Sequence, residues 1–294
     1  MRFLRFLGRE LVLHGILFAV VGTVVLSALY LLSIGAPPNA YVDAAKSFCL
    51  LISGSKDYSM MHPGFSSSQI IASGAAVTLP LALISLIFLI LIALICSANA
   101  VTGRYLEINH GEKKLEILHK IISVITSFFA AVPLFVGFWF LYAVIGDGIS
   151  IPLIALLTVL LGGLSWDATN FLKTDMLSQV DSTHAIVYST LGHNLGLFFP
   201  LPGTYSGYLF SSSLPRFIPY LAGKVPAIIG SVTIAEVAFS FPGLGSTLLD
   251  ALLATNTDLL VTSVFILLCV NAVVSFIVKT ILFLIYPRVY EKAI

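Results

Sequence analysis

Residues 71–97 read IASGAAVTLPLALISLIFLILIALICS and contain no charged side chain. An α-helix needs about 20 predominantly apolar residues to cross the hydrocarbon core of a bilayer. A stretch of this length and composition therefore predicts a membrane-spanning helix. It is too long and too continuous for a strand of a membrane β-barrel, in which lipid-facing and lumen-facing residues alternate.

The composition of the whole chain agrees with this prediction. Of its 294 residues, 58% are hydrophobic and 10% are charged, whereas a soluble domain carries about 25% charged residues. The mean hydropathy is +1.03, and a soluble protein this apolar could not cover its surface. The net charge of +1 provides no basic field for nucleic acid, so none is expected as a partner.

Five further apolar runs predict helices of the same kind, so we expect an all-α integral membrane protein with one transmembrane domain over residues 1–294. The six predicted spans are about 11–34, 71–97, 117–145, 149–166, 214–239 and 259–286. The first follows a basic start, as a signal peptide does. Its apolar core of about 24 residues exceeds the roughly 7–15 of a signal peptide, so a retained helix is expected.

The distribution of Lys and Arg predicts the orientation. With six crossings, the basic residues that flank the spans fall on one side of the membrane, except for Lys46 and Lys56. Because basic loops mark the cytoplasmic side, we expect a multi-pass protein of the plasma or inner membrane with both termini in the cytoplasm. The segment 167–213 is then the longest cytoplasmic stretch, and loops of such length often carry function.

No pattern in the sequence predicts bond chemistry. The three cysteines lack metal-ligand spacing, and neither an HExxH nor a GxxxxGK[ST] motif is present. We therefore expect no catalytic residues, no metal site and no cofactor.

Lys224 is a charged residue inside the fifth predicted span. A charge at membrane depth is costly and usually faces protein or a water-filled path. Two interpretations stay open: a lysine that meets the substrate on a pathway, and a lysine that snorkels or forms a pair within the bundle.

The stretch EVAFSFPGLG, residues 236–245, follows this span. Pro242 ends a helix, and glycines 243 and 245 permit a sharp turn before a short amphipathic helix. The block resembles the E-x-x-F-x-x-P-G-L-G signature of the permease subunits of dipeptide, oligopeptide and nickel ABC importers. Weaker similarities in the second and third spans and in YPRVYEK near the end fall in the family's order, so the chain is identified as a divergent member.

The resemblance implies the fold of a type I ABC importer permease and a function in transport. Such a subunit forms half of a translocation path with a second homologous permease. It receives substrate from an extracytoplasmic binding protein and is driven by two cytoplasmic ATPase subunits, so it is not itself an enzyme. The resemblance also places an outer gate at Glu236, Phe239, Pro242, Gly243 and Gly245.

The family carries a cytoplasmic helix that docks on the ATPase, and the stretch MLSQVDSTHAIVYSTLG, residues 176–192, has its position and length. The family's acid, Arg and Lys are replaced by Ser178, Ser189 and Leu191. We expect a helix over about Asp175–Ser189 that docks mainly through apolar groups. The expected coupling residues are Met176, Val180, Asp181, Ile186, Val187, Tyr188 and Gly192.

Two other functions are kept as alternatives. A secondary transporter without an ATPase would favour membrane acids or inverted repeats, and an intramembrane enzyme would need a site that the sequence does not offer. Within the ABC importers, the substrate stays open between peptides, oligosaccharides and nickel.

Overall fold

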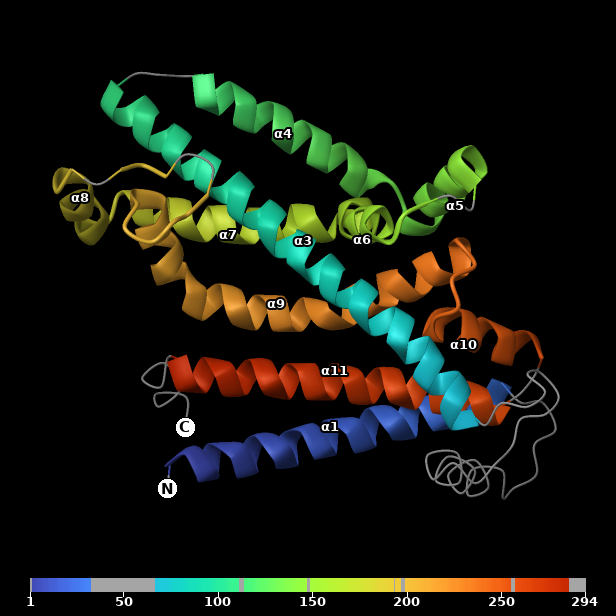
Figure 1. Ribbon diagram of the computed structural model, residues 1–294. Helices are drawn as coiled ribbons and strands as arrows, with labels where there is room; N and C mark the ends of the chain where they lie inside the picture. Colours follow the sequence, from blue (N-terminus) through green and yellow to red (C-terminus); the bar gives the residue numbers. More distant parts are fainter. Residues whose placement is uncertain are drawn as a thin grey trace. The chain divides into compact units, whose positions relative to one another are not determined.

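A computed structural model describes residues 2–32, 67–110, 114–146, 149–192, 194–196, 199–254 and 257–285. Within these ranges every regular element is a helix and no strand occurs, which confirms the predicted all-α class. Figure 1 shows the helices coloured in chain order. The predicted outer segment between the first two spans lies largely outside the described residues.

The structure contains short and long helices in an order that follows the apolar runs. Their bounds are α1 Arg2–Leu32, α3 Ser67–His110, α4 Lys114–Ala131, α5 Leu134–Ile145, α6 Ile151–Leu160, the 3₁₀ helix η2 Leu161–Gly163, α7 Leu164–Val180, α8 Thr183–Thr190, α9 Tyr205–Ala238, α10 Leu244–Leu253 and α11 Thr257–Ile285.

Four stretches of the described residues are long and apolar enough to cross a membrane, or five if one bent pair of helices counts as a single span. The four are Arg5–Val24, Gln69–Ile108, Ile151–Val180 and Tyr205–Ala238. They overlap the first, second, fourth and fifth predicted spans. The sixth, about 259–286, falls on α11, where several side chains lie outside the described part of the chain, and it stays a prediction.

The third predicted span, about 117–145, falls on a bent pair of helices, and it counts as one span only if the two helices are taken together. α4 and α5 meet at an angle of 93° across Val132 and Pro133. Pro133 has no backbone N–H, and its ring excludes the carbonyl that a continuing helix would place there. The amide of Gly137 then starts a new helical turn by donating to the Pro133 carbonyl at 3.0 Å.

The contacts within the chain form two compact units. Unit 1 comprises residues 1–80 and 232–281, and unit 2 comprises residues 81–231 and 282–294. The helices α3 and α9 pass from one unit into the other.

Unit 2 is built around η2, which joins α6 to α7. Gly162 and Gly163 have φ values of 72° and 83°, a left-handed conformation that glycine adopts without steric cost. The amide of Gly162 donates to the carbonyl of Val132 at 3.4 Å, so η2 lies against the break between α4 and α5. A Cβ on Gly137 would lie 2.9 Å from the Leu161 side chain, so α5 approaches η2 closely.

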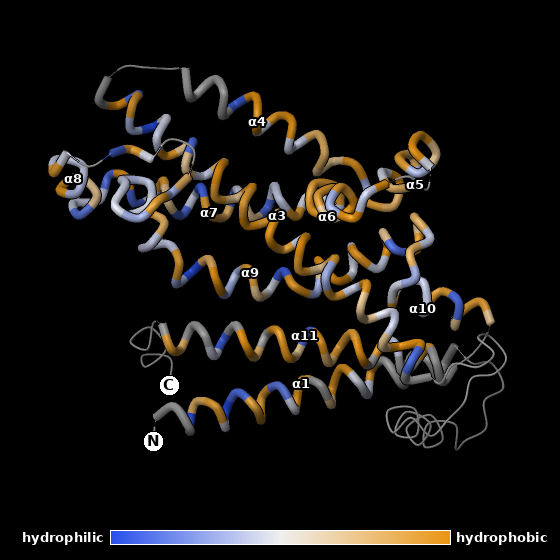
Figure 2. The backbone as a smooth tube through the Cα atoms, in the orientation of Figure 1, coloured by the Kyte–Doolittle hydropathy of each residue, from blue (hydrophilic) through white to orange (hydrophobic). Residues whose placement is uncertain are grey.

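The predicted cytoplasmic stretch 167–213 is mostly helical at both ends. α7 continues to Val180, and α9 begins at Tyr205, so the connection between these long helices is residues 181–204. The single helix predicted over Asp175–Ser189 is wrong: a turn at Asp181 and Ser182 separates α7 from α8. Figure 2 shows hydrophobic residues along α5 and α6 and more hydrophilic residues on α7.

The polar residues of α7 are compatible with a helix because much of that helix packs inside unit 2. Ala168, Leu172 and Met176 recur at intervals of four and are fully buried. Other helices of the unit leave apolar side chains exposed, as a lipid-facing surface does; on α4 these include Val124 at 69% and Phe128 at 67%.

Candidate functional sites

The five residues predicted for the outer gate lie in the last turn of α9, in the turn that follows it and at the start of α10. α9 ends at Ala238, and Phe239 is buried at 5% exposure. The chain then reverses at Ser240, which has a φ of 55°, and the amide of Phe241 donates back to the carbonyl of Glu236 at 2.9 Å. Gly243 precedes the first residue of α10.

Glu236 holds the start of α10 through its carboxylate. The side chain is fully buried, and its Oε2 accepts a hydrogen bond of 2.7 Å from the amide of Gly245. The hydroxyl of Thr78 on α3 accepts a second one, of 2.9 Å, from the amide of Leu244. Two of the amides that a helix N-terminus leaves unpaired are thus satisfied by side chains from other helices.

The glycines of this turn are required for space. Gly243 has a φ of −102°, which any residue can adopt. A Cβ there would overlap the Glu236 carboxyl group, and a Cβ on Gly245 would lie 2.5 Å from the carbonyl oxygen of Thr233. A Cβ added to Gly74 on α3 would lie 3.2 Å from backbone atoms of Gly243 and Leu244. The sequence predicted the position of the turn correctly. Glycine is required at residues 243 and 245, however, because other atoms lie too close for a side chain, and not because the backbone needs the conformational freedom of glycine.

The short helix predicted after the turn is confirmed as α10. Leu244 and Ala251 are buried, whereas Leu252 and Leu253 are 54% and 73% exposed. Between α10 and the neighbouring helix ends lies a cavity of about 410 Å³, to which Ser73, Ser240 and Asp250 contribute.

The predicted coupling residues fall into two groups. Met176 and Val180 are buried at 0% and 7% exposure in α7. Ile186 and Val187, on α8, are 52% and 54% exposed, and Asp181 in the preceding turn is also exposed. Only the second group is available to a partner without rearrangement of unit 2.

α8 is fixed at its end and along one side. Gly192 has a φ of 77° and stands two residues beyond the end of α8, which is the common position of a glycine that ends a helix. The ring of Tyr188 stacks on that of Tyr208 in α9, with centroids 4.2 Å apart and planes at 8°. Buried Ala185 faces the same unit. The exposed apolar side chains therefore stand on a helix with a defined position.

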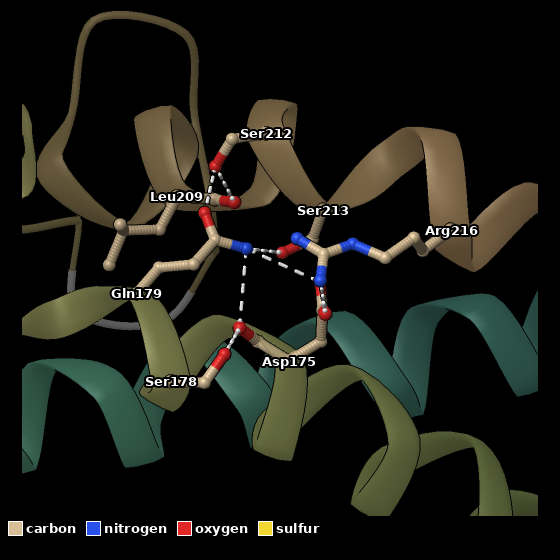
Figure 3. A network of polar contacts seen from close by, with 7 residues as sticks. All are labelled: Asp175, Ser178, Gln179, Leu209, Ser212, Ser213 and Arg216. Atoms are coloured by element: carbon tan, nitrogen blue, oxygen red, sulfur yellow. Dashed lines mark hydrogen bonds and ion pairs between the residues drawn. The ribbon is translucent and has the colours of Figure 1, made fainter. Parts of the chain in front are cut away.

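A polar network that the sequence did not predict joins α7 to α9 (Figure 3). The Nε2 of Gln179 donates to the Ser213 hydroxyl at 2.9 Å, and Ser212 donates to the Oε1 of Gln179. The carboxylate of Asp175 pairs with Arg216 at 2.8 Å and lies 3.3 Å from the Gln179 Nε2. Gln179 is 7% exposed, so the network is largely shielded from solvent at its centre.

Lys224 has a partner inside unit 2. Its Nζ lies 2.8 Å from the Oδ2 of Asp167 on α7 and 5.3 Å from the centroid of the Tyr220 ring. Tyr220 in turn stacks on Phe171, with centroids 4.1 Å apart. The geometry is that of an ion pair within the bundle, which is one of the two interpretations that the sequence left open.

Among the described residues, no group of three or more His, Cys, Asp or Glu side chains is arranged to hold a metal ion.

Comparison with known proteins links this arrangement to transport. Residues 110–290 match the family described as "Binding-protein-dependent transport system inner membrane component". Two curated relatives from strains of Streptococcus pneumoniae, each named "Oligopeptide transport system permease protein AmiC", are 30% identical over 64 residues. That match covers 22% of this chain and 13% of each relative.

Proposed function

This chain belongs to the family of inner membrane components of binding-protein-dependent transport systems, and from that premise we propose that it is one of two permease subunits of an ATP-driven importer. The subunit itself carries out no bond chemistry. It forms half of the translocation path and converts the movement of cytoplasmic ATPase subunits into access from the opposite face, a rigid-body type of switch.

The observation that carries this proposal is the exposed apolar face of α8. Ile186 and Val187 project from a short helix that is attached to unit 2 by the stacked rings of Tyr188 and Tyr208. Apolar groups at the centre of an interface contribute most of its binding energy. We propose that α8 docks on an ATPase subunit, with Asp181 and Leu191 at the rim.

The remaining coupling residues act from inside the unit in this proposal. Met176 and Val180 fix the end of α7, and Gly192 ends α8. Gln179 ties α7 to α9, so a push on α8 reaches two long helices together.

The outer turn is proposed as part of the gate on the extracytoplasmic side. Thr78 holds α10 against the N-terminal part of α3 and Glu236 holds it against α9, so α10 cannot tilt without the loss of hydrogen bonds to two buried groups. Phe239, Pro242, Gly243 and Gly245 shape the same turn. The orientation follows from the Lys and Arg distribution, with both termini in the cytoplasm.

The partners are then a second, homologous permease, two cytoplasmic ATPase subunits, an extracytoplasmic binding protein and the bilayer. Oligopeptides are the proposed cargo, because the curated relatives are named for oligopeptide transport. The sequence alternatives of an oligosaccharide or nickel are outcomes of the same uptake assay. The described residues contain no metal-ligand cluster that would favour nickel.

Cysteine cross-linking tests the docking. Ile186→Cys or Val187→Cys, expressed with the neighbouring ATPase genes, is expected to form a cross-link to an ATPase subunit in membranes. Leu253→Cys is the matched control, because Leu253 is 73% exposed but lies on α10 at the proposed outer side. A cross-link from Leu253→Cys with none from α8 contradicts the proposal, as does uptake by the permease in vesicles that contain no ATPase.

A further inference from the structure

The helices α7 and α9 of unit 2 pack along a seam whose contacts recur every four residues. Residues pair in opposite order along the two chains, so the helices are antiparallel. Because residues four apart lie on one face of a helix, the contacts form one continuous strip. The four layers of this α7–α9 seam are the ion pair of Asp167 with Lys224, the stacked rings of Phe171 and Tyr220, the ion pair of Asp175 with Arg216, and the hydrogen bond between Gln179 and Ser212 (Figure 3 shows the last two).

The layer of Asp167 and Lys224 lies at membrane depth. α9 forms the candidate span Tyr205–Ala238, in which Lys224 stands about 28 Å from the start and about 21 Å from the end at 1.5 Å per residue. A hydrocarbon core of about 30 Å, placed anywhere along this helix, therefore includes Lys224. The side chains of the pair are nevertheless exposed, Lys224 at 24% and Asp167 at 45%. Charges at this depth face protein or water and not lipid.

The exposed face of α9 differs from the faces that suit lipid. On α5, the side chains of Phe135, Trp139 and Phe140 are each more than 60% exposed. The structure describes every residue of α9, and Ile234 near its end is the one large apolar side chain exposed on that helix. The face beside the seam thus offers little apolar surface to acyl chains. Its exposed positions recur every three or four residues and are small or polar: Ser212, Arg216, Pro219, Gly223 and Ala227.

The charges of the seam also favour water over a packed protein surface as its cover. Arg216 is 59% exposed, although Asp175 beside it is only 12% exposed. A helix packed over the seam would remove two ion pairs from water, and this desolvation can exceed the attraction within the pairs. Both pairs keep free groups on their exposed side, since a guanidinium has five N–H donors and a carboxylate has about four acceptor sites.

The spacing of the two ion pairs fits a short peptide with free ends. The carboxylate of Asp167 can accept the N–H groups of a terminal ammonium, and the planar guanidinium of Arg216 matches a terminal carboxylate. The two layers are two steps of four residues apart, or about 12 Å along the helices. An extended chain of three or four residues covers a similar length at about 3.3–3.6 Å per residue. A neutral oligosaccharide has no charged group for either layer.

We propose that the α7–α9 seam lines the water-filled path of the importer, and that its two ion-pair layers bind the ammonium and carboxylate ends of a peptide in transit. This inference rests on the proposed function, in which the chain forms half of such a path and oligopeptides are the cargo. It adds which face of the subunit is in water and which residues select a zwitterionic chain. Lys224 is then paired within the bundle and also faces the path, so the two interpretations of its charge combine.

Thiol labelling of the assembled importer, with the natural cysteines replaced by alanine, tests the exposure to water. Gly223→Cys and Ala227→Cys should react with a membrane-impermeant methanethiosulfonate at least about tenfold faster than Val124→Cys, because a thiol forms its reactive thiolate in water and not in lipid. Val124 is the matched control, since it is 69% exposed on α4. The new side chain at Gly223 has room, because a Cβ there meets nothing within 4 Å. The reagent is added to both faces of the membrane, because the path opens to one side at a time.

Protection from labelling tests the class of cargo. Trialanine should slow the labelling of Gly223→Cys in a saturable way, by about twofold when half of the sites are occupied, whereas trialanine with acetylated and amidated ends should not. The binding protein is left out, so that its own selectivity does not enter. Asp167→Asn should remove the protection by trialanine. Glu107→Gln is the matched control, because Glu107 is also a partly exposed, paired acid of unit 2 but lies outside the seam, and it should leave the protection unchanged.

Two sets of outcomes overturn the inference. Labelling of Gly223→Cys and Ala227→Cys as slow as that of Val124→Cys, or a disulfide from these positions to the second permease in place of labelling, shows that lipid or protein covers the face. Equal protection by free and capped trialanine, or unchanged protection in Asp167→Asn, shows that the ion pairs do not bind the ends of the cargo. Uptake by each cysteine variant is measured before labelling: ATP-driven uptake with an unlabelled face contradicts only this inference, whereas uptake that needs no ATPase contradicts the proposed function.

Discussion

Gly245→Ala gives the sharpest test of how the outer turn is built. The added Cβ would stand 2.5 Å from the oxygen and 2.7 Å from the Cα of Thr233, whereas non-bonded carbon atoms prefer about 3.5–4.0 Å. Both neighbours are backbone atoms near the C-terminal end of α9, so they cannot rotate away as a flexible side chain could. Overpacking of this kind costs about 1–3 kcal/mol.

A second loss follows if the turn opens to relieve the overlap. The amide of Gly245 would then leave the Oε2 of Glu236, and a buried group left without its hydrogen bond costs about 1–3 kcal/mol. The two losses share one contact, so Gly245→Ala and Glu236→Leu, which removes the acceptor, should not be additive, with a coupling energy of about 0.5–3 kcal/mol.

Thermal unfolding in detergent, followed by tryptophan fluorescence, measures the effect. Each kcal/mol should lower the melting temperature by about 2–4 °C in a protein of this size class. Gly223→Ala on α9 is the matched control, because a Cβ there meets nothing within 4 Å. Equal melting temperatures for the two alanine variants, or strict additivity with Glu236→Leu, would refute the close approach.

Three further predictions concern unit 2. Lys224→Met and Asp167→Asn should each lower the stability by no more than about 1 kcal/mol, since Asp167 is 45% exposed and exposed ion pairs contribute little. A double-mutant cycle by thermal unfolding measures the coupling energy of the pair, and a value of several kcal/mol would contradict the prediction. Gly192→Ala should destabilise the end of α8 by about 1–2 kcal/mol, because a Cβ is disfavoured at a φ of 77°. Limited proteolysis between α8 and α9 should therefore be faster in the variant, and an unchanged rate of cleavage would contradict the prediction. Gln179→Leu should lower the stability by about 1–3 kcal/mol, because it leaves Ser213 without its hydrogen-bond partner. If Gln179 connects α7 to α9, the variant should also lower the amount of substrate taken up per ATP hydrolysed. An unchanged amount of substrate per ATP would contradict a role of Gln179 in coupling.

Most of the membrane-spanning helices could be located from the sequence because their signal is local. In lipid, the backbone N–H and C=O groups of a charge-free run such as 71–97 must form hydrogen bonds with one another, so the run forms a helix whatever surrounds it. The turn at Pro242 and Gly243 was visible for a similar reason, since proline and glycine end helices by their own geometry. Pro133 also marks the bend between α4 and α5 in the sequence, but the span over residues 117–145 was predicted from its average hydropathy, which a single proline hardly changes.

The contacts that build the sites could not be predicted, because they join residues far apart in the chain. Lys224 and Asp167 are 57 positions apart, and Gln179 and Ser213 are 34 apart. The polar sequence of α7 suggested a loop, whereas its polar groups pair with α9 and leave the helix intact. Likewise, Gly245 is required by the position of Thr233, which no local pattern contains.

The right-angled break between α4 and α5 has a consequence for how this protein enters the membrane. α5, with 12 residues, extends only about 18 Å and cannot by itself cross a hydrocarbon core of about 30 Å. The backbone at the break is covered by η2, whose Gly162 amide reaches the Val132 carbonyl, and η2 emerges from the ribosome later. Biogenesis therefore has an order: Pro133 bends the chain at once, but the hydrogen bond that covers the break can form only after Gly162 has been synthesised.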